Sequence, residues 1–284
     1  MENLTTTFKL NNGVEMPWVG YGTYKTPVEE TESVVSEALE IGYRHIDTAA
    51  FYQNEKGVGQ AVRKSGISRE EIFVTSKVWN SNRGYEKTKK AFEDTMRELD
   101  MDYLDLYLIH WPANRKQYGD KAKSINAETW RAMEELYMEG RIKAIGLSNF
   151  LPHHIDELLE TAKIKPMVNQ IELHPGWLQP EVVEYCHRND IVVEAWSPLG
   201  RNTILNNETL LDIANKYGKS VAQICLRWVL QHNVVPLPKS VTPSRIKMNT
   251  EIFDFILDEK DMKVIDSLRD IGGRCAQPDE EIFE

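Results

Sequence analysis

Four residues with proton-binding side chains, Asp47, Tyr52, Lys77 and His110, stand close to the ends of three successive strand-like runs. A phenol is a poor acid at neutral pH because its unperturbed pKa is ~10. A neighbouring ammonium group stabilises the phenolate and lowers that pKa, so Lys77 is expected to help Tyr52 release a proton. A carboxylate can keep the ammonium charged, and an imidazole can hydrogen-bond a carbonyl oxygen. The four residue types therefore predict a proton-donating site suited to carbonyl reduction.

Each of these residues also has an ordinary structural interpretation. Asp47 can cap a turn, and Tyr52 can be a packing residue. Lys77 can be a solvated strand end, and His110 can be a half-buried histidine with its hydrogen bonds satisfied. The combination at three consecutive strand ends favours the chemical interpretation, because separate strand ends of an α/β barrel converge on one shared mouth.

The elements that position these residues are short apolar runs that alternate with amphipathic segments. In Glu29–Ile41, for example, Val34, Val35, Ala38 and Leu39 recur at helical spacing. Eight strands that alternate with helices predict one (β/α)8 TIM barrel over residues 1–284, with a doubly wound sheet as the alternative. The strand candidates are Val19–Tyr21, Tyr43–Ile46, Ile72–Lys77, Leu104–Ile109, Ile142–Gly146, Met167–Gln170, Val192–Trp196 and Val234–Leu237. The helix candidates are Glu29–Ile41, Gly57–Ser65, Tyr85–Asp100, Ala127–Glu139, Pro152–Ala162, Pro180–Arg188 and Val221–Gln231.

Additional elements are expected at both ends of the chain. An Asn-Gly step at positions 12–13 lies between Thr7–Leu10 and Val14–Met16, and such a step predicts a β-hairpin with a type I′ turn. This N-terminal β-hairpin would close the bottom of the barrel. Near the other end, Pro243–Phe253 and Asp258–Leu268 predict two extra C-terminal helices, the second capped by its first residue.

The composition excludes several classes of protein. The chain has 284 residues, 41% of them hydrophobic and 27% charged, which is ordinary for a globular domain. Its net charge of -10 argues against a nucleic-acid-binding surface. No apolar run approaches the ~20 residues of a membrane span, and no signal peptide is evident. Cys186, Cys225 and Cys275 are too dispersed for a disulfide framework or a zinc site. We therefore expect a cytoplasmic protein with no membrane partner, no nucleic-acid partner and no metal.

Three long segments of the sequence resemble the aldo-keto reductase family. Gly42–Glu55 resembles the segment around the family's aspartate and tyrosine, Met101–Pro112 its histidine segment, and Lys239–Ile246 its cofactor-phosphate segment. The resemblance extends from about the hairpin to Leu268. It implies a barrel that uses NADPH to reduce carbonyl compounds. Trp196 stands where many members carry tyrosine, which makes the chain more similar to the bacterial group of 2,5-diketo-D-gluconate reductases and glyoxal reductases.

The resemblance also implies where NADP(H) binds, since no Rossmann fingerprint is present. The nearest string, Gly57–Val62, lacks the third glycine and does not follow a strand. Ser148, Asn149 and Gln170 match the family's carboxamide-binding residues, although Asn149 can also be a helix N-cap. The residues that the resemblance assigns to the cofactor are Thr23, Tyr24, Asp47, Ser148, Asn149, Gln170, Trp196, Ser197, Leu199, Arg201, Lys239, Ser240, Val241, Thr242, Arg245 and Asn249.

A local basic, hydroxyl-rich patch at 239–245 interrupts the acidic character of the chain. Phosphate binds well to helix N-termini and to guanidinium groups, so the patch favours NADPH, which has an extra ribose phosphate, over NADH. Alternatively, Arg245 and Lys247 form a solvated helix face. The family often has Glu or Gln before the asparagine that contacts adenine. Here Met248 precedes Asn249, which implies one adenine hydrogen bond fewer.

The resemblance places Tyr24, Tyr52, Trp79, His110 and Trp111 around the substrate. The chain after Leu268 is short, which predicts an open mouth and broad acceptance of small aldehydes, dicarbonyls and keto sugars. A monomer is the form expected from the family. Two alternatives remain: an aldolase that forms a Schiff base through Lys77, and a non-catalytic, NADP-binding regulatory barrel.

Overall fold

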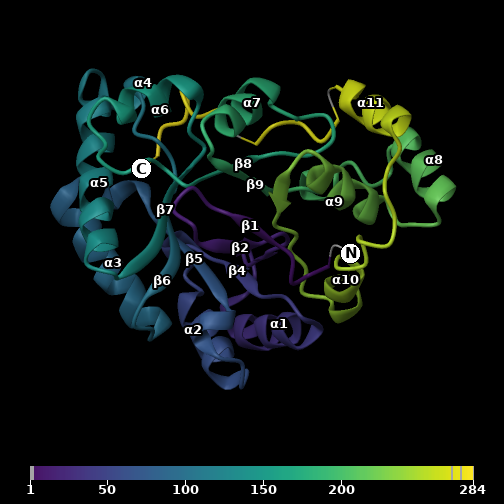
Figure 1. Cartoon of the computed structure of the whole chain (residues 1–284), viewed down its shortest axis with the longest axis horizontal. Coiled ribbons are helices and arrows are strands. Elements are labelled where there is room, and N and C mark those ends of the chain that lie inside the picture. The colour runs from purple at the N-terminus through teal and green to yellow at the C-terminus, as the bar shows by residue number, and fades with distance from the viewer. Residues whose placement is uncertain (1–2, 270, 276, 284) are drawn as a thin grey trace.

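The computed structural model describes residues 3–269, 271–275 and 277–283. Eight of its strands form one sheet in which every neighbouring pair is parallel. Figure 1 shows the strands near the centre of the molecule with helices around them. The sheet strands are β3 (Tyr21–Gly22), β4 (His45–Asp47), β5 (Phe73–Val78), β6 (Leu104–Ile109), β7 (Ile142–Ser148), β8 (Val168–Glu172), β9 (Val192–Trp196) and β10 (Val234–Pro236).

The sheet closes into the predicted (β/α)8 barrel. Its ladder runs from β10 through β9 to β3, and the two edge strands then meet through backbone hydrogen bonds. Gly20 N donates to Pro236 O at 3.1 Å, and Gly22 N donates to Pro238 O at 3.0 Å. A Cβ atom on Gly20 would lie 2.4 Å from a methyl carbon of Leu237, so this close approach requires glycine. A doubly wound sheet would have left these edges apart.

The helices agree with the prediction in most places. The short helix α4 (Arg115–Tyr118) was not predicted, α6 ends at Leu159 instead of Ala162, and three further helices differ. Helix α5 begins at Lys121 instead of Ala127. Its first turns were missed because Asn126 is a polar residue that interrupts the apolar pattern, although its buried amide bonds to both backbone groups of Ala113. Helix α8 was not predicted, since only three of its residues are buried. Helix α10 ends at Met248, whose carbonyl accepts from a glutamine side chain. The α-helices are α1 (Val28–Ile41), α2 (Glu55–Lys64), α3 (Tyr85–Leu99), α4 (Arg115–Tyr118), α5 (Lys121–Met138), α6 (Pro152–Leu159), α7 (Pro180–Arg188), α8 (Glu208–Tyr217), α9 (Val221–Gln231), α10 (Pro243–Met248) and α11 (Glu259–Ser267).

The predicted N-terminal hairpin is present, but its turn type is different. Strands β1 (Thr7–Lys9) and β2 (Glu15–Pro17) pair antiparallel. Gly13 has a φ of 90°, whereas Asn12 keeps a negative φ, so the loop is a three-residue turn with a glycine bulge and not type I′. The Asn12 amide donates to Lys143 O near the start of β7 at 2.9 Å. The hairpin therefore covers the N-terminal end of the barrel, opposite the end that holds the predicted site.

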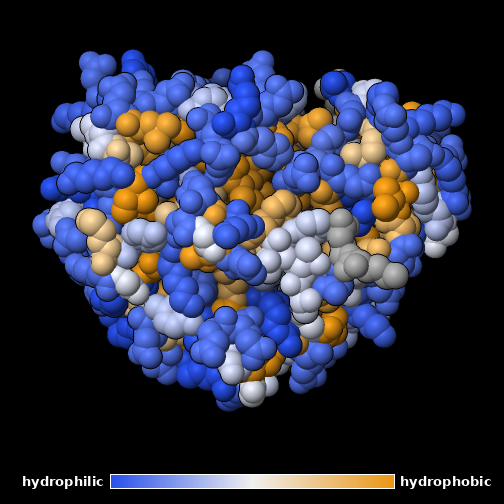
Figure 2. All heavy atoms as spheres, viewed as in Figure 1, coloured by the Kyte–Doolittle hydropathy of each residue, from blue (hydrophilic) through white to orange (hydrophobic). Residues whose placement is uncertain are grey.

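The glycine string in Gly57–Val62 lies inside helix α2, as the sequence predicted, and is not a phosphate loop. A Cβ atom on Gly59 would lie 2.0 Å from Leu99 O, so the glycine allows α2 to pack closely against the end of α3. Polar side chains cover most of the face shown in Figure 2, and apolar side chains gather in its central hollow. Among the described residues, no helix is long and apolar enough to cross a bilayer.

Candidate active site

A buried ion pair lies at the C-terminal end of strands β4 and β5. The Lys77 ammonium donates to both carboxylate oxygens of Asp47 at 2.8 and 2.7 Å, and to Thr48 O at 2.9 Å. Its side chain is 0% exposed. Burial alone would lower the pKa of Lys77, but the Asp47 charge and the hydrogen bonds to Asp47 oppose burial, and the net pKa lies above its ordinary value. Lys77 is therefore a fixed, permanently charged ammonium group.

Tyr52 lies beside this ammonium on the short 3₁₀ helix η1 (Ala50–Tyr52) that follows β4. Its hydroxyl lies 3.4 Å from Lys77 Nζ. Burial raises the pKa of Tyr52 to about 12, and the nearby Lys77 charge only partly opposes this increase. Lys77 lowers the pKa of Tyr52, as the sequence predicted, but burial, which was not predicted, is the larger effect and the net pKa is raised. The phenol is protonated at neutral pH and retains a proton that it can donate.

The loop that carries Tyr52 is fixed by Asn54, a residue to which we assigned no role from the sequence. The Thr48 hydroxyl donates to Asn54 Oδ1 at 2.7 Å, and Asn54 Nδ2 donates to Thr23 O at 3.0 Å. Thr23 in turn donates its hydroxyl to Asp47 O at 2.9 Å. These buried hydrogen bonds connect the chain after β3 to the chain after β4. They hold the segment with Tyr52 against the ion pair.

His110 completes the predicted quartet at the end of β6. Its ring centroid lies 5.7 Å from that of Tyr52, edge to face, and 5.0 Å from that of Trp79. Burial, with smaller contributions from the Lys77 and Arg83 charges, holds the pKa of His110 well below its usual value. The imidazole is therefore neutral. Its Nδ1 atom is buried without a hydrogen-bond partner among the described residues.

Aromatic side chains surround this quartet, as the sequence predicted for Tyr24, Trp79 and Trp111. The ring of Tyr24 lies 5.0 Å from that of Tyr52. Trp79 stacks on Phe51 with a centroid distance of 3.8 Å, and half of the Phe51 side chain remains exposed. Phe51 belongs to the segment Gly42–Glu55, which resembles the family, but its contact with Trp79 was not predicted. The aromatic rings form a wall beside the proton-donating group.

The C-terminal tail, residues 277–283, lies against this wall, a contact that the sequence did not predict. The Phe283 ring lies 5.6 Å from Trp79 and 5.2 Å from Trp111. The side chain of Asn114 donates to Pro278 O at 2.8 Å and to a second tail carbonyl at 2.7 Å. A tail of few residues can therefore cover the mouth because the loop before α4 holds its backbone.

A cluster of His153, His154 and Asp279 anchors the same tail to α6. The Nε2 atom of each histidine lies 3.0 Å from Asp279 Oδ1. These three residues place possible metal ligands within 4.8 Å of one another. However, His154 Nδ1 accepts the Leu151 N–H at 3.2 Å, so the ring proton of His154 must be on Nε2, which faces Asp279. This arrangement favours a hydrogen-bonded anchor over a metal site.

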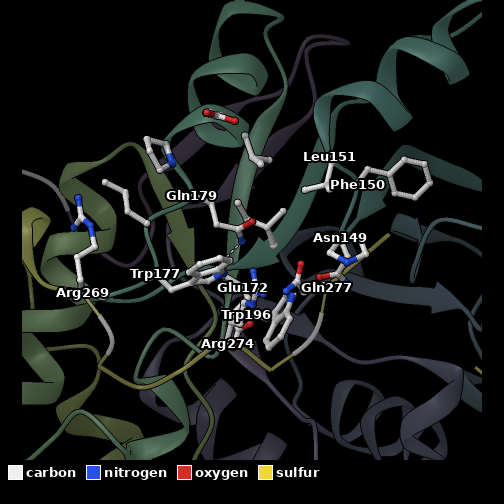
Figure 3. Close-up of a pocket in the computed structure, with 17 residues that line it drawn as sticks. Asn149, Phe150, Leu151, Glu172, Trp177, Gln179, Trp196, Arg269, Arg274 and Gln277 are labelled. Carbon is white, nitrogen blue, oxygen red and sulfur yellow. Dashed lines mark hydrogen bonds between the residues drawn. The ribbon is translucent and has the colours of Figure 1, made fainter. Parts of the chain in front are cut away.

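A cavity of about 500 Å³ lies between the tail and the loop before α7. Figure 3 shows Trp177, Glu172 and Trp196 on one side and Gln277 of the tail nearby. The guanidinium of Arg274 lies 5.4 Å from the Trp177 ring centroid. Because Trp196 and Asn149 line the cavity, it adjoins the predicted cofactor site.

The residues predicted to hold a carboxamide form a hydrogen-bonded network. Asn149 Nδ2 donates to His110 O at 2.9 Å and to Ser148 Oγ at 3.1 Å, and Asn149 Oδ1 accepts from Trp196 Nε1 at 2.9 Å. The Ser148 hydroxyl donates to Gln170 O. Asn149 has a φ of 64° and is not a helix cap, because α6 begins after Leu151. The asparagine therefore fixes the ring of Trp196, and the remaining oxygen lone pairs are available to a ligand.

Gln170 connects two carboxyl groups inside the barrel. Its Nε2 atom donates to Asp47 Oδ2 and to Glu194 Oε2, each at 2.9 Å. Both side-chain amide hydrogens of Gln170 are thus used, and its side-chain carbonyl oxygen, Oε1, is the group left for a ligand. Glu194 was not among the predicted site residues. Its position in a buried run on β9 gave no indication that it contacts the quartet.

The loop after β9 contains the predicted pyrophosphate residues. Ser197 and Arg201 have positive φ values of 50° and 52°, which are uncommon for residues other than glycine. Leu199 lies between them and is half-buried. The Arg201 guanidinium carbon lies 6.0 Å from the Trp196 ring centroid. Strained backbone of this kind concentrates at ligand-binding sites, and here it brings a cation next to the ring.

The basic patch at 239–245 lies where β10 leads into α10. Lys239 donates to Lys25 O at 3.2 Å, and burial lowers its pKa. The hydroxyl of Tyr21 donates to Ser240 O at 2.6 Å and fixes the patch to the barrel. The side chains from Val241 to Arg245 are all exposed, whereas Asn249 is buried. Arg245 forms no ion pair among the described residues.

A closed eight-stranded barrel with this quartet at its C-terminal mouth is the arrangement of an aldo-keto reductase. Residues 18–270 match the model of the Aldo/keto reductase family, so the chain belongs to this family of NADP-dependent oxidoreductases. It is 53% identical to a glyoxal reductase of Bacillus subtilis (strain 168) over 99% of both chains. The aldo-keto reductase MGS-M4, from a Medee basin deep-sea metagenome library, is 46% identical, with a TM-score of 0.91 over 98% of this chain and 100% of that one. A variant of Gox0644 crystallised with NADPH is 40% identical, with a TM-score of 0.90 over 98% and 99%.

Proposed function

We propose that this chain uses NADPH to reduce small aldehydes, dicarbonyls and keto sugars to alcohols, with Tyr52 as the proton donor. The observation that carries the proposal is the Lys77 ammonium, which lies between the Asp47 carboxylate and the Tyr52 hydroxyl. Family membership supports carbonyl reduction. The similarity to a glyoxal reductase supports dicarbonyls as one substrate class.

In this proposal the nicotinamide supplies a hydride to the carbonyl carbon. Tyr52 donates its proton to the oxygen, and Lys77 stabilises the phenolate that results. His110 is neutral, so its imidazole can donate a hydrogen bond to the carbonyl oxygen without competing for the proton. Asp47 keeps Lys77 charged and oriented. The aromatic wall excludes water from the developing alkoxide.

The residues around Trp196 suit a nicotinamide carboxamide. The Gln170 carbonyl can accept one carboxamide N–H because the Gln170 amide hydrogens are already bound. Asn149 and Ser148 have oxygen lone pairs left, and Asn149 holds Trp196 in an orientation where its ring can stack on the nicotinamide. The other residues proposed for the cofactor are Thr23, Tyr24, Ser197, Leu199, Arg201, Lys239, Ser240, Val241, Thr242, Arg245 and Asn249.

Arg245→Ala is expected to raise the KM for NADPH by about 10- to 100-fold, because a guanidinium–phosphate pair with two charge-assisted hydrogen bonds is lost. The KM for NADH should change much less, since NADH lacks the ribose phosphate. Initial rates with both cofactors measure the difference. Lys247→Ala, an exposed residue of the same helix, is the matched control. Equal effects on NADPH and NADH would remove Arg245 from the phosphate site.

Phe283→Ala is expected to widen the substrate range. The ring contacts Trp79 and Trp111, so its loss enlarges the mouth and reduces apolar contact with small substrates. We expect kcat/KM for methylglyoxal to fall about threefold to tenfold, while bulky aromatic aldehydes are less affected or improve. Ile282→Ala, an exposed neighbour in the tail, should change neither value. A uniform loss for all aldehydes would show that Phe283 does not determine size selectivity.

The two alternatives receive less support. A Schiff-base aldolase requires an uncharged lysine, whereas Lys77 is held as an ammonium by Asp47. A non-catalytic barrel has no need for the complete quartet. We further propose that residues 1–284 form one domain that acts as a monomer, since one chain contributes every residue of the proposed site.

The direct test is to mix the purified protein with NADPH and methylglyoxal and to follow the loss of reduced-nicotinamide absorbance. Oxidation that depends on both compounds supports the proposal. If no carbonyl in a panel of aldehydes, dicarbonyls and keto sugars is reduced although NADPH binds, the chain is a regulatory barrel. If neither NADPH nor NADH binds, the cofactor assignment is wrong as well.

A further inference from the structure

The interior of this barrel is unusually polar next to the Asp47–Lys77 pair, near the C-terminal ends of the strands. The interior of a (β/α)8 barrel is normally filled by branched apolar side chains. Here His45, Thr75 and Glu194 are all 0% exposed and lie next to the Asp47–Lys77 pair. Buried ionisable groups are costly, and violations of the usual core pattern tend to mark functional sites. The quartet does not account for Glu194 or His45.

Glu194 is connected to the quartet through a single amide. Its Oε2 atom accepts one hydrogen from Gln170 Nε2, and the other hydrogen of that nitrogen goes to Asp47 Oδ2. Gln170 and Glu194 are paired across strands β8 and β9, whereas Asp47 lies on β4 (Figure 1). The amide therefore spans the barrel interior. Any change in the charge or position of Glu194 acts on Asp47 and then on Lys77.

We propose that Glu194 is a positioning residue of the reductase site, which carries a proton in the active form and holds Gln170 against Asp47. This inference rests on the proposed function, because it assigns Glu194 a part in that same reaction. Glu194 contacts the Asp47–Lys77 pair only through Gln170, so its influence on turnover is indirect.

The surroundings of Glu194 favour its protonated form. From β4 it is faced by His45 and Asp47, and from β5 by Lys77. Its register neighbour on β10, Val235, is apolar. Burial, followed by the Asp47 charge, raises the pKa of Glu194 to about 8. The acid is therefore uncharged at neutral pH.

The proton of Glu194 belongs on Oε1, since Oε2 accepts from Gln170. Oε1 has no hydrogen-bond partner in the part of the chain that the structure describes, and it lies 3.5 Å from His45 Nε2. Burial, with a smaller contribution from the Lys77 charge, lowers the pKa of His45 to about 3, so the ring is neutral. His45 Nε2 also lies 3.0 Å from Thr75 Oγ1. A neutral imidazole next to a neutral acid adds no charge to the core.

Loss of the Glu194 proton would put a second negative charge next to Asp47. The Gln170 amide would then lie between two anions, and a charge this close opposes the formation of a phenolate at Tyr52. The shifts of three groups of the quartet take their titration away from this pH. The pKa of Tyr52 is about 12, that of Lys77 is raised, and that of His110 is well below its usual value. Glu194 is thus placed to set an alkaline limit on turnover.

The first test compares the pH dependence of kcat in the wild type and in Glu194→Gln, which keeps the size and the acceptor oxygen but cannot ionise. We expect wild-type kcat to fall about tenfold above pH ~8, and the variant profile to stay flat there. Glu55→Gln is the matched control, because Glu55 is a second buried carboxyl with a raised pKa, bonded to Ser76 outside the site. The control should keep the wild-type profile.

The second test needs no turnover. The infrared spectrum of the wild-type protein should contain the carbonyl band of a protonated carboxylic acid that disappears above pH ~8 and is absent in Glu194→Gln. Because the folded pKa of Glu194 exceeds the unfolded one, its contribution to stability is complete at low pH and is lost as pH rises through about 8. The melting temperature of Glu194→Gln relative to wild type should therefore increase with pH.

These outcomes separate the inference from the proposed function. A wild type without reductase activity but with the infrared band would overturn the function and leave a protonated Glu194. An active wild type with no such band, or with identical pH profiles in wild type and Glu194→Gln, would overturn the positioning role. If Glu194→Gln does not fold, the infrared spectra of the wild type and of Glu55→Gln decide. The inference is wrong if the wild type lacks the band, or if the band in Glu55→Gln persists unchanged above pH ~8.

Discussion

Tyr52→Phe is expected to lower kcat by about 10²- to 10⁴-fold, the usual contribution of a positioned general acid. The variant loses the phenolic proton that lies beside the Lys77 ammonium. Its ring keeps the contacts with Tyr24 and His110, so the shape of the site should persist. The Kd for NADPH, measured by quenching of tryptophan fluorescence, should change by less than about twofold.

Tyr103→Phe is the matched control, because this tyrosine lies just before β6, at the other end of the barrel, and should retain full activity. The pKa of about 12 also predicts how Tyr52 affects the pH dependence of the rate. The phenol remains protonated from about pH 5 to 9, so its own titration should not appear in the rate profile over this range. Turnover in Tyr52→Phe close to the wild-type rate would require a different proton donor.

The sequence was sufficient to predict the quartet because the barrel converts a simple pattern into proximity. Asp47, Lys77 and His110 each end an apolar run, and parallel strands of a closed barrel bring such ends to one rim. The strands were recognisable because β5 and β6 are buried along their whole length and are continuously apolar or β-branched apart from a few polar positions. The quartet and its strands could be predicted because the local sequence pattern agrees with the barrel fold.

Other features depend on contacts that no local pattern encodes. Gln170 joins Asp47 and Glu194 across the barrel. In the sequence, a glutamate within an apolar run indicates equally well that the strand is wrongly predicted or that the side chain has a buried hydrogen-bond partner. Phe283 reaches Trp79 only because Asn114 and Asp279 hold the tail in place. The length of the tail did not predict these contacts. Gln170 and Asp47 are 123 positions apart in the sequence, and Asn114 and Pro278 are 164 apart.

The pKa of Tyr52 shows a further limit of sequence reasoning. The neighbour that lowers this pKa, Lys77, could be predicted from the strand ends. The burial that raises it could not, because it is produced by residues from many elements around the phenol. Burial is the larger effect in the protein without ligands. The proximity of two groups was thus predictable, whereas the net balance of their energies required the three-dimensional environment.

The last prediction concerns the Asp47–Lys77 pair, and it separates stability from catalysis. Lys77→Met leaves a buried carboxylate, and Asp47→Asn leaves a buried ammonium without its counter-charge. Each single variant should lower the free energy of unfolding by about 3–5 kcal/mol, as measured by urea denaturation. The double variant should recover most of this loss, since a neutral pair of similar volume carries no desolvation penalty.

Activity should not recover with stability. Both single variants and the double variant should lose at least about 10²-fold in kcat, because the two variants with Lys77→Met lack the ammonium and Asp47→Asn removes the carboxylate that keeps the ammonium charged and oriented. A double variant that regains stability but not turnover would assign the buried charges to the reaction, which retains them despite their cost to the fold. A double variant as unstable as its parents would instead indicate that the hydrogen bonds of Lys77 to Asp47 and Thr48, and not the balance of charge, hold this end of the barrel together.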